Sequence, residues 1–347
     1  MSSTIQTDLP AFARSRINLA SAELGAVGLS ASDAFFAPLA RMLADAPAVF
    51  YPDRYDDHGK WMDGWESRRK RGPGHDHAII RLAVPGIIYG FDVDTSHFTG
   101  NYPPAFSIEA CRTEGEPDGA TEWIEIQGRA ALGPSNHHFF SCDNGLVWTH
   151  VRLNIYPDGG VARLRVYGEP WRDWSKLAPD EEVDLASALN GGRVVAFSDA
   201  HYGALHRVLA PGRGLNMGDG WETRRRREPG NDWLIVQLGH PGIISRIVVD
   251  TAHYKGNYPD RCSLDAADLG NASLDGASGD LTQMIITSSM FWPEILPQHK
   301  LSMDAVHDFG AADIAQSGGM AGRVSHVRLN IYPDGGVSRL RIFGTVR

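Results

Sequence analysis

The stretch HVRLNIYPDGGVARLRVYG, residues 150–168, recurs almost letter for letter as HVRLNIYPDGGVSRLRIFG at residues 326–344. The two copies lie 176 positions apart, and sixteen of their nineteen residues are identical. Identity over such a length indicates an internal duplication, so the chain is built from two related units.

The repeated stretch has the alternating pattern of a β-strand. Val151, Leu153 and Ile155 alternate with polar residues, which gives the strand one apolar and one polar face. The same alternation resumes after PDGG, whose residue types favour a turn. We therefore interpret residues 150–168 as two strands joined in a hairpin.

Most of the remaining sequence also indicates strands. The segments HAIIRLAV (77–84) and IIYGFDVDT (87–95) predict two strands separated by Pro85–Gly86. Only SDAFFAPLARML (32–43) has helical character, with an N-cap at Ser32 or Asp33. Many short strands between Gly and Pro turns favour an all-β fold. We predict two tandem jelly-roll β-sandwich domains that arose by duplication.

The duplication extends well beyond the opening stretch. In order along the chain, NLASAELGA corresponds to DLASALNGG, SDAFF to SDAHY, DGWESRRKR to DGWETRRRR, and DTSHFTGNYP to DTAHYKGNYP. The spacing between these blocks differs between the halves, as expected when length changes fall in loops. The unmatched segment EPWRDWSKLAPDEE lies between the halves. We predict a first repeat at residues 1–169, a linker at 170–183 and a second repeat at 184–347.

The composition limits the classes of function. The chain has 347 residues, of which 42% are apolar, and a net charge of −9 at pH 7. This acidic balance argues against nucleic acid as a partner. No apolar run approaches the length of a membrane span, and residues 1–20 lack the apolar core of a signal peptide. Three cysteines are too few for a disulfide framework, so we expect a cytoplasmic protein without a membrane partner.

The block DGWESRRKR and its copy carry more charge than packing requires. Carboxylates stand beside several guanidinium groups, and a guanidinium pairs bidentately with a carboxylate ligand. A solvated ion-pair turn or a latch at an interface is an equally good interpretation. On the functional interpretation, the candidate catalytic residues are Asp63, Glu66, Asp219 and Glu222, and the candidate substrate-binding residues are Arg68, Arg69, Arg224 and Arg225.

The block DTSHFTGNYP and its copy combine a strand-end histidine with a Gly-Asn loop. Histidine suits a general acid or base because its ordinary pKa lies near neutrality. A histidine in this place can also serve the structure alone. On the functional interpretation, the candidate catalytic residues are Asp94, His97, Asp250 and His253, and the candidate substrate-binding residues are Asn101, Tyr102, Asn257 and Tyr258.

Two further groups are ambiguous. Arg152 and its copy Arg328, on the polar face of the opening strand, suit either an anionic substrate or a buried contact between domains or subunits. Histidines at 75, 77, 137 and 138 offer nitrogen ligands, but no spacing matches a known zinc motif. No cofactor is therefore certain, and a divalent metal remains open. Signatures of serine hydrolases, P-loop NTPases and Rossmann dehydrogenases are missing from the sequence.

Together, the motifs GKWMDGWESRRKR, DTSHFTGNYPP, PGRGLNMGDGWETRRRR, DTAHYKGNYPD and the doubled YPDGG closely resemble those of allantoicases, or allantoate amidinohydrolases. The resemblance covers residues 18–344, and each half also looks like a galactose-binding or discoidin-type jelly roll. It implies hydrolysis of allantoate to ureidoglycolate and urea in purine (allantoin) catabolism, by a cytosolic homo-oligomer. It implies no catalytic assignment, so the residue roles above rest on chemistry.

The chemistry of allantoate suits these residues, since it is a carboxylate with two ureido groups on one carbon. Arginines can hold the carboxylate, while a carboxyl group and a histidine protonate the departing urea and activate water. Because the first half carries extra histidines, we expect it to supply the main pocket, with His97 as acid or base and Asp63 or Glu66 as its partner. A non-catalytic tandem jelly-roll ligand-binding protein and a related ureido hydrolase acting on ureidoglycolate remain alternatives.

Overall fold

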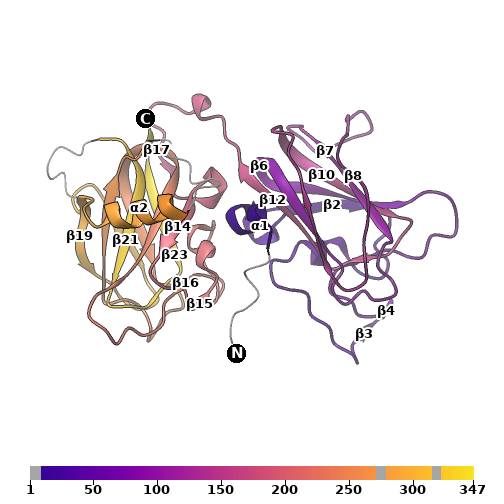
Figure 1. Cartoon of the computed structure of the whole chain (residues 1–347), viewed down its shortest axis with the longest axis horizontal. Coiled ribbons are helices and arrows are strands. Elements are labelled where there is room, and N and C mark those ends of the chain that lie inside the picture. The colour runs from indigo at the N-terminus through magenta and orange to yellow at the C-terminus, as the bar shows by residue number, and fades with distance from the viewer. Residues whose placement is uncertain (1–8, 271–278, 315–321) are drawn as a thin grey trace. The chain divides into compact units, whose positions relative to one another are not determined.

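The chain divides into two compact units, Met1–Trp171 and Arg172–Arg347, each made mainly of antiparallel strands (Figure 1). The structure, a computed structural model, describes residues 9–270, 279–314 and 322–347. Residues 1–8, on which part of the signal-peptide expectation rests, lie outside these ranges. No helix of the described ranges has the length and apolar character needed to cross a membrane.

The first unit opens with the short helix α1 (Ala11–Ser15) and contains two 3₁₀ turns, η1 (Ala22–Leu24) and η2 (Leu39–Leu43). Its strands are β1 (Ile17–Asn18), β2 (Val27–Ala31), β3 (Tyr55–Asp56), β4 (Gly59–Lys60), β5 (Trp65–Glu66), β6 (Asp76–Asp94), β7 (Ala105–Cys111), β8 (Ile124–Ala131), β9 (His137–Ser141), β10 (Val147–Tyr156), β11 (Gly160–Val161) and β12 (Arg163–Pro170).

Strand β6 runs through one continuous eight-stranded sheet and joins its two parts. Its first part pairs with β2 and β10, and through β10 with β7 and β8. Its last part pairs with β12 and β9, and through β12 with β1. We call these two parts the β10 sheet and the β12 sheet. The two predicted strands at 77–84 and 87–95 are therefore one continuous strand, because Gly86 keeps its place in the ladder and pairs with both Trp148 and Pro170.

The apolar residues of both sheets pack into one core. Leu153 and Ile80 of the β10 sheet and Leu164 and Phe91 of the β12 sheet are members of the same cluster, and none is more than 1% exposed. Burying such a side chain contributes about 1.5–3 kcal/mol. The predicted all-β fold of tandem jelly-roll sandwiches is thus confirmed, since in each unit the two parts of an eight-stranded antiparallel sheet contribute to one shared core.

The hairpin predicted for residues 150–168 is wrong. Strand β10 pairs with β6 and β7, whereas β12 pairs with β6 and β1, so the turn between them carries the chain from one sheet to the other. Alternation identifies a strand but does not identify its neighbour. The turn bends sharply at Gly159, whose φ of 141° favours glycine.

The helix predicted at residues 32–43 is also wrong. Residues 32–38 have no helical conformation, and only the 3₁₀ turn η2 follows, with Pro38 as its N-cap. Proline disfavours a helical conformation of the residue before it and cannot donate a backbone hydrogen bond, so a helix cannot continue through this position.

The second unit repeats this plan. Its helix is α2 (Gly279–Ser289), and its 3₁₀ turns are η3 (Trp174–Lys176), η4 (Ala188–Asn190) and η5 (Leu205–Leu209). Its strands are β13 (Val183–Asp184), β14 (Arg193–Phe197), β15 (Tyr202–Gly203), β16 (Trp221–Glu222), β17 (Asp232–Asp250), β18 (Arg261–Ala267), β19 (Glu294–Lys300), β20 (Val306–Phe309), β21 (Val324–Tyr332), β22 (Gly336–Val337) and β23 (Arg339–Val346).

Strand β17 takes the place of β6, because it pairs with β14 and β21 in its first part and with β23 and β20 in its last. The main addition is α2, which packs Ile285 against Ala196 and Ile235 of the β21-containing sheet. The first unit has no described helix in the corresponding place.

Candidate active site

A carboxyl group and an amide meet at the end of the first sandwich. Asn101 Nδ2 donates a hydrogen bond of 2.6 Å to Glu66 Oε1. Glu66 is only 8% exposed, and this burial raises the pKa of its carboxyl above the ordinary value, against the opposing effect of the Asn101 bond. In the second unit Asn257 Nδ2 donates to Glu222 Oε1 in the same way. The pairing is thus built twice.

The three duplicated blocks of the sequence converge to make this pair. Glu66 pairs with Gly160 in the short β5–β11 ladder, and the Gly160 amide donates to the backbone oxygen of Asn101 at 2.7 Å. A side chain at Gly160 would overlap the buried Phe98 ring, with its Cβ against Cε1. The close approach of YPDGG to the loop at 97–102 therefore requires glycine and fixes Asn101 beside Glu66.

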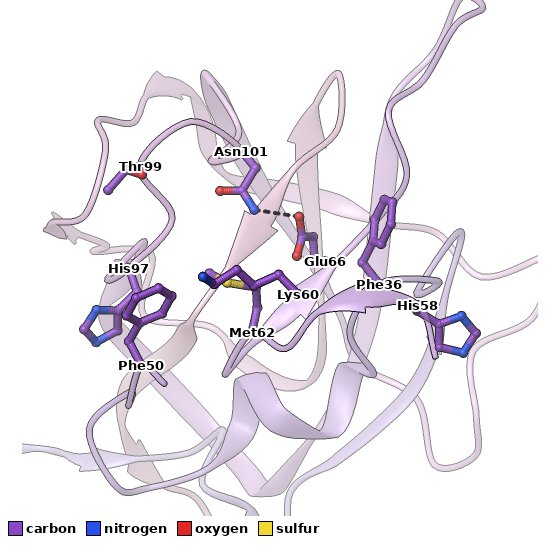
Figure 2. Close-up of a pocket in the computed structure, with 10 residues that line it drawn as sticks. Phe36, Phe50, His58, Lys60, Met62, Glu66, His97, Thr99 and Asn101 are labelled. Atoms are coloured by element: carbon purple, nitrogen blue, oxygen red, sulfur yellow. Dashed lines mark hydrogen bonds between the residues drawn. The ribbon is translucent and has the colours of Figure 1, made fainter. Parts of the chain in front are cut away.

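A pocket of about 410 Å³ opens beside the Glu66–Asn101 pair (Figure 2). Figure 2 shows Lys60 and Met62 in its middle, His97 and Phe50 on one side, and Phe36 and His58 on the other. Its size suits a small molecule. The lining residues are Phe36, Phe50, His58, Gly59, Lys60, Met62, Glu66, His97, Thr99 and Asn101.

His97 lines this pocket and contacts two neighbouring residues of its wall, Ala48 and Phe50. Its backbone has a φ of 70°, a left-handed conformation that is uncommon for residues other than glycine. Its Nε2 lies 3.1 Å from the backbone oxygen of Ala48, which can only accept, so Nε2 carries the proton in this contact. The ring also stacks on Phe50. His253 repeats the arrangement, with a φ of 72° and Nε2 2.7 Å from the Gly214 oxygen.

Asp63 and Asp219 are bound to buried arginines. Arg163, 1% exposed, donates from Nη2 to Asp63 Oδ2 at 2.7 Å, and the backbone amide of Val49 donates to the same oxygen. Asp219 likewise accepts from Arg339, at 2.8 Å, and its guanidinium partners hold the pKa of its carboxyl below the ordinary value against the larger, opposing effect of burial. These carboxylates neutralise buried cations, and neither Asp63 nor Asp219 lines the pocket beside Glu66.

Asp94 and Asp250 shape the turn that follows β6 and β17. Both are buried, and each carboxylate accepts a hydrogen bond of 2.7 Å from the backbone amide two residues later, Ser96 and Ala252 respectively. Such a bond stabilises a tight turn. The turn leads directly into the left-handed histidine, so these aspartates set the direction of the loop.

The arginines of the DGWE blocks lie outside the Glu66 pocket. Arg68 is exposed and pairs with Asp33 at 2.7 Å, and Arg69 is exposed as well. In the second unit, Arg224 and Arg225 instead help to line a separate pocket of about 290 Å³ with two further arginines and acidic residues.

The tyrosines Tyr102 and Tyr258 are half-buried and pack against apolar side chains. Tyr102 packs near Met62 and Phe98, and Tyr258 packs against the main core of the second unit.

Arg152 and Arg328 lie on the outer face of their sheets. Arg152 Nε donates to Glu109 at 2.7 Å, and its guanidinium stacks on Trp123. Arg328 stacks on Trp233 and donates to Ser289 of α2. The neighbours of Arg152 in β10 point into the core, so the arginine lies on the opposite face of the sheet.

Three of the histidines that the sequence offered as metal ligands, His75, His137 and His138, contact other protein groups. His137 Nδ1 is bonded to the buried Asp92 at 2.8 Å, while His138 contacts the backbone of Val93 and Gly133 through its two ring nitrogens. His75 contacts Asn154. Within the described ranges, no group of three or more His, Cys, Asp or Glu side chains is arranged to hold a metal ion.

Several pocket residues are not among the candidates that the sequence predicts. Phe50, His58 and Lys60 have no counterpart in the second repeat, so a comparison of the repeats does not select them. The segment between Ala44 and Asp63 has eighteen residues, whereas the equivalent segment between Ala210 and Asp219 has eight. The length difference itself, visible in the sequence, was the available signal.

Comparison with known proteins agrees with this architecture. The allantoicase repeat family matches residues 17–171 and 183–347. A probable allantoicase of Rhizobium meliloti is 61% identical over 97% of this chain and 96% of its own length. A probable allantoicase 2 of Burkholderia pseudomallei is 55% identical over 98% of each chain. The crystal structure of allantoicase from Saccharomyces cerevisiae is 35% identical, with a TM-score of 0.75 over 94% of this chain and 92% of that one. The chain therefore belongs to the allantoicase family.

Proposed function

We propose that this chain hydrolyses allantoate to ureidoglycolate and urea, and that the reaction takes place in the Glu66 pocket. Membership of the allantoicase family supports the reaction. The observation that carries the location is the buried Glu66 carboxyl, held by Asn101 at the edge of a pocket of suitable size. A buried carboxyl with a raised pKa beside a cavity is a candidate acid or base.

Glu66 serves as the general acid in this proposal. Its raised pKa favours the protonated form, which donates its proton to the ureido nitrogen as the bond from that nitrogen to the central carbon breaks. A water molecule supplies the oxygen that bonds to the carbon, and its released proton returns to the Glu66 carboxylate. The products are urea and ureidoglycolate, and the enzyme ends in its starting protonation state.

Asn101 and His97 position the reacting groups. The Asn101 amide occupies Glu66 Oε1, which leaves Oε2 for the substrate, and its own Oδ1 points away from Glu66, where it can accept from a ureido N–H (Figure 2). His97 holds the Ala48 carbonyl and supports Phe50. In this proposal His97 therefore fixes the pocket wall, rather than acting as the acid or base itself.

We assign the main reaction to the first repeat. Glu222 forms the same bond to Asn257 but is more exposed than Glu66. The segment 45–62, which supplies half of the pocket lining, is ten residues longer than its equivalent in the second repeat. Lower burial raises the pKa of a carboxyl less, and a shorter segment encloses the pocket less, so the second repeat is a poorer site for a general acid.

The test is an assay of the purified protein with allantoate, in which urea and ureidoglycolate are both quantified. Equimolar release of the two products that Glu66→Gln abolishes supports the proposal. Binding of allantoate without turnover would identify a ligand-binding protein instead. Consumption of ureidoglycolate, but not of allantoate, would identify the related ureido hydrolase.

We also propose that the chain is cytoplasmic and associates with itself. Buried cysteines Cys111, Cys142 and Cys262, all free, are consistent with a reducing compartment. Exposed apolar residues just after α2, with Phe291 at 83% and Met290 at 69%, favour burial against another copy. Analytical ultracentrifugation that finds only a 37.9 kDa species would contradict self-association.

A further inference from the structure

The first repeat contains a short two-stranded hairpin, and the corresponding segment of the second repeat is ten residues shorter. Within the longer segment 45–62, strands β3 and β4 pair through Tyr55 with Lys60 and through Asp56 with Gly59. We call residues 50–61, which contain this two-stranded turn, the aromatic hairpin. It carries Phe50, His58, Gly59 and Lys60 into the lining of the Glu66 pocket. The hairpin is therefore the part of the pocket that distinguishes the repeats.

Stacked cations and aromatic rings hold the hairpin in shape. The Arg54 guanidinium lies 4.2 Å from the Trp61 ring centre and 5.6 Å from that of Tyr51. Arg41, in η2, lies over the same Trp61 ring at 5.0 Å. Each such contact contributes about 0.5–1 kcal/mol at an exposed site. The contact from Arg41 ties the hairpin to the sandwich.

We propose that Lys60, on the aromatic hairpin, binds the carboxylate of the substrate and so selects for an anionic ureido compound. This inference rests on the proposed location of the reaction. Lys60 is the one lysine or arginine among the described residues that line the pocket, and Figure 2 shows its side chain between His97 and Glu66. Its Nζ donates to the Pro52 oxygen at 2.8 Å, which leaves two N–H groups for a ligand.

The charges around Lys60 suit a carboxylate ligand. No described carboxylate lies within ion-pair distance of its ammonium group, which instead faces the rings of Phe50 and Tyr55 at 4.9 and 5.5 Å. Arg68, the sequence candidate for this role, is already paired with Asp33. Burial favours the neutral form of Glu66, so a bound carboxylate meets one cation and little repulsion.

The experiment compares Lys60→Met with Lys60→Arg in the full-length protein. Lys60→Met removes the charge and keeps the length, so we expect KM for allantoate to rise about ten- to a hundredfold, the size of a charge-assisted hydrogen bond, with kcat changed far less. Lys60→Arg keeps the charge and should recover most of that loss. Arg71→Met, which removes an exposed charge outside the pocket, is the matched control and should keep the KM of the wild type.

A second readout tests the charge directly. The carboxamide analogue of allantoate lacks the anion, so the preference of the wild type for allantoate over this amide should shrink in Lys60→Met. An unchanged KM in Lys60→Met, or an equal rise in Lys60→Arg, would overturn the assignment. Glu66→Gln, assayed alongside, separates the two proposals: if it abolishes kcat while Lys60→Met behaves as wild type, only the role of Lys60 is wrong.

Discussion

Replacing Glu66 with glutamine should remove the general acid while preserving the structure of the site. Glutamine keeps an oxygen that can accept the 2.6 Å bond from Asn101, so the loop stays in place and KM should change little. It cannot donate a proton as a carboxyl does. Loss of a general acid lowers kcat about 10²- to 10⁴-fold, which at 1.36 kcal/mol for each factor of ten is about 2.7–5.4 kcal/mol of transition-state stabilisation.

The pH dependence of Glu66→Gln should differ from that of the wild type in two ways. Since burial raises the pKa of Glu66, wild-type kcat/KM should fall as pH rises through that raised value, and the variant should lack this limb. The folded state also holds this proton more tightly than the unfolded chain. Wild-type stability from this group is therefore complete below the ordinary glutamate pKa and is lost as pH rises through the raised one. Glutamine avoids that loss.

The assays are steady-state kinetics with urea detection and thermal unfolding at neutral pH. We expect Glu66→Gln to melt no lower than the wild type, and Glu222→Gln to retain most of its activity. A Glu66→Gln protein that unfolds cooperatively and keeps kcat within a few-fold of wild type would refute the assignment of Glu66 as the acid. Loss of kcat in Glu222→Gln alone would move the reaction to the second repeat.

Three further variants separate structure from catalysis. Asp63→Asn leaves the buried Arg163 without its counter-charge, so we expect a loss of about 3–5 kcal/mol in urea denaturation with kcat of the folded fraction preserved. A specific loss of kcat without destabilisation would return Asp63 to the active site. For His137, the bond to Asp92 raises the histidine pKa, so this contact stabilises the fold below the ordinary histidine pKa and stops doing so as pH rises through the raised value. His137→Gln should flatten the stability profile as pH rises from the ordinary histidine pKa through the raised one, and an unchanged slope would contradict that role. Gly160→Ala should cost about 1–3 kcal/mol by forcing a methyl group against the ring beneath it, and a wild-type melting temperature would show that the turn can yield.

The fold was accessible from the sequence because duplication and period-two alternation are both written in residue types. The strand at Val151, Leu153 and Ile155 is predicted by its apolar face alone. Its partner is not, because pairing depends on where the YPDGG turn sends the chain. For that reason the predicted hairpin failed where the strands themselves were right.

The candidate site divides in the same way. Comparing the repeats selected Glu66 and Asn101, which the structure joins, because both are needed wherever the duplicated loops meet. The same comparison also selected Asp63, which pairs with a buried arginine, and Asp94, which stabilises the turn after β6. It could not select Lys60, because a residue that makes one repeat different has no counterpart to match.

The strand shared by both sheets has a consequence for how each unit opens. Asp76–Asp94 supplies hydrogen bonds to the β10 sheet at one end and to the β12 sheet at the other, and Asp232–Asp250 does the same in the second unit. One part of the sheet cannot separate from the core while the shared strand stays hydrogen-bonded to the other part. Amide protons at the two ends of the strand should therefore exchange with solvent at similar slow rates, through one opening event that exposes the whole sandwich.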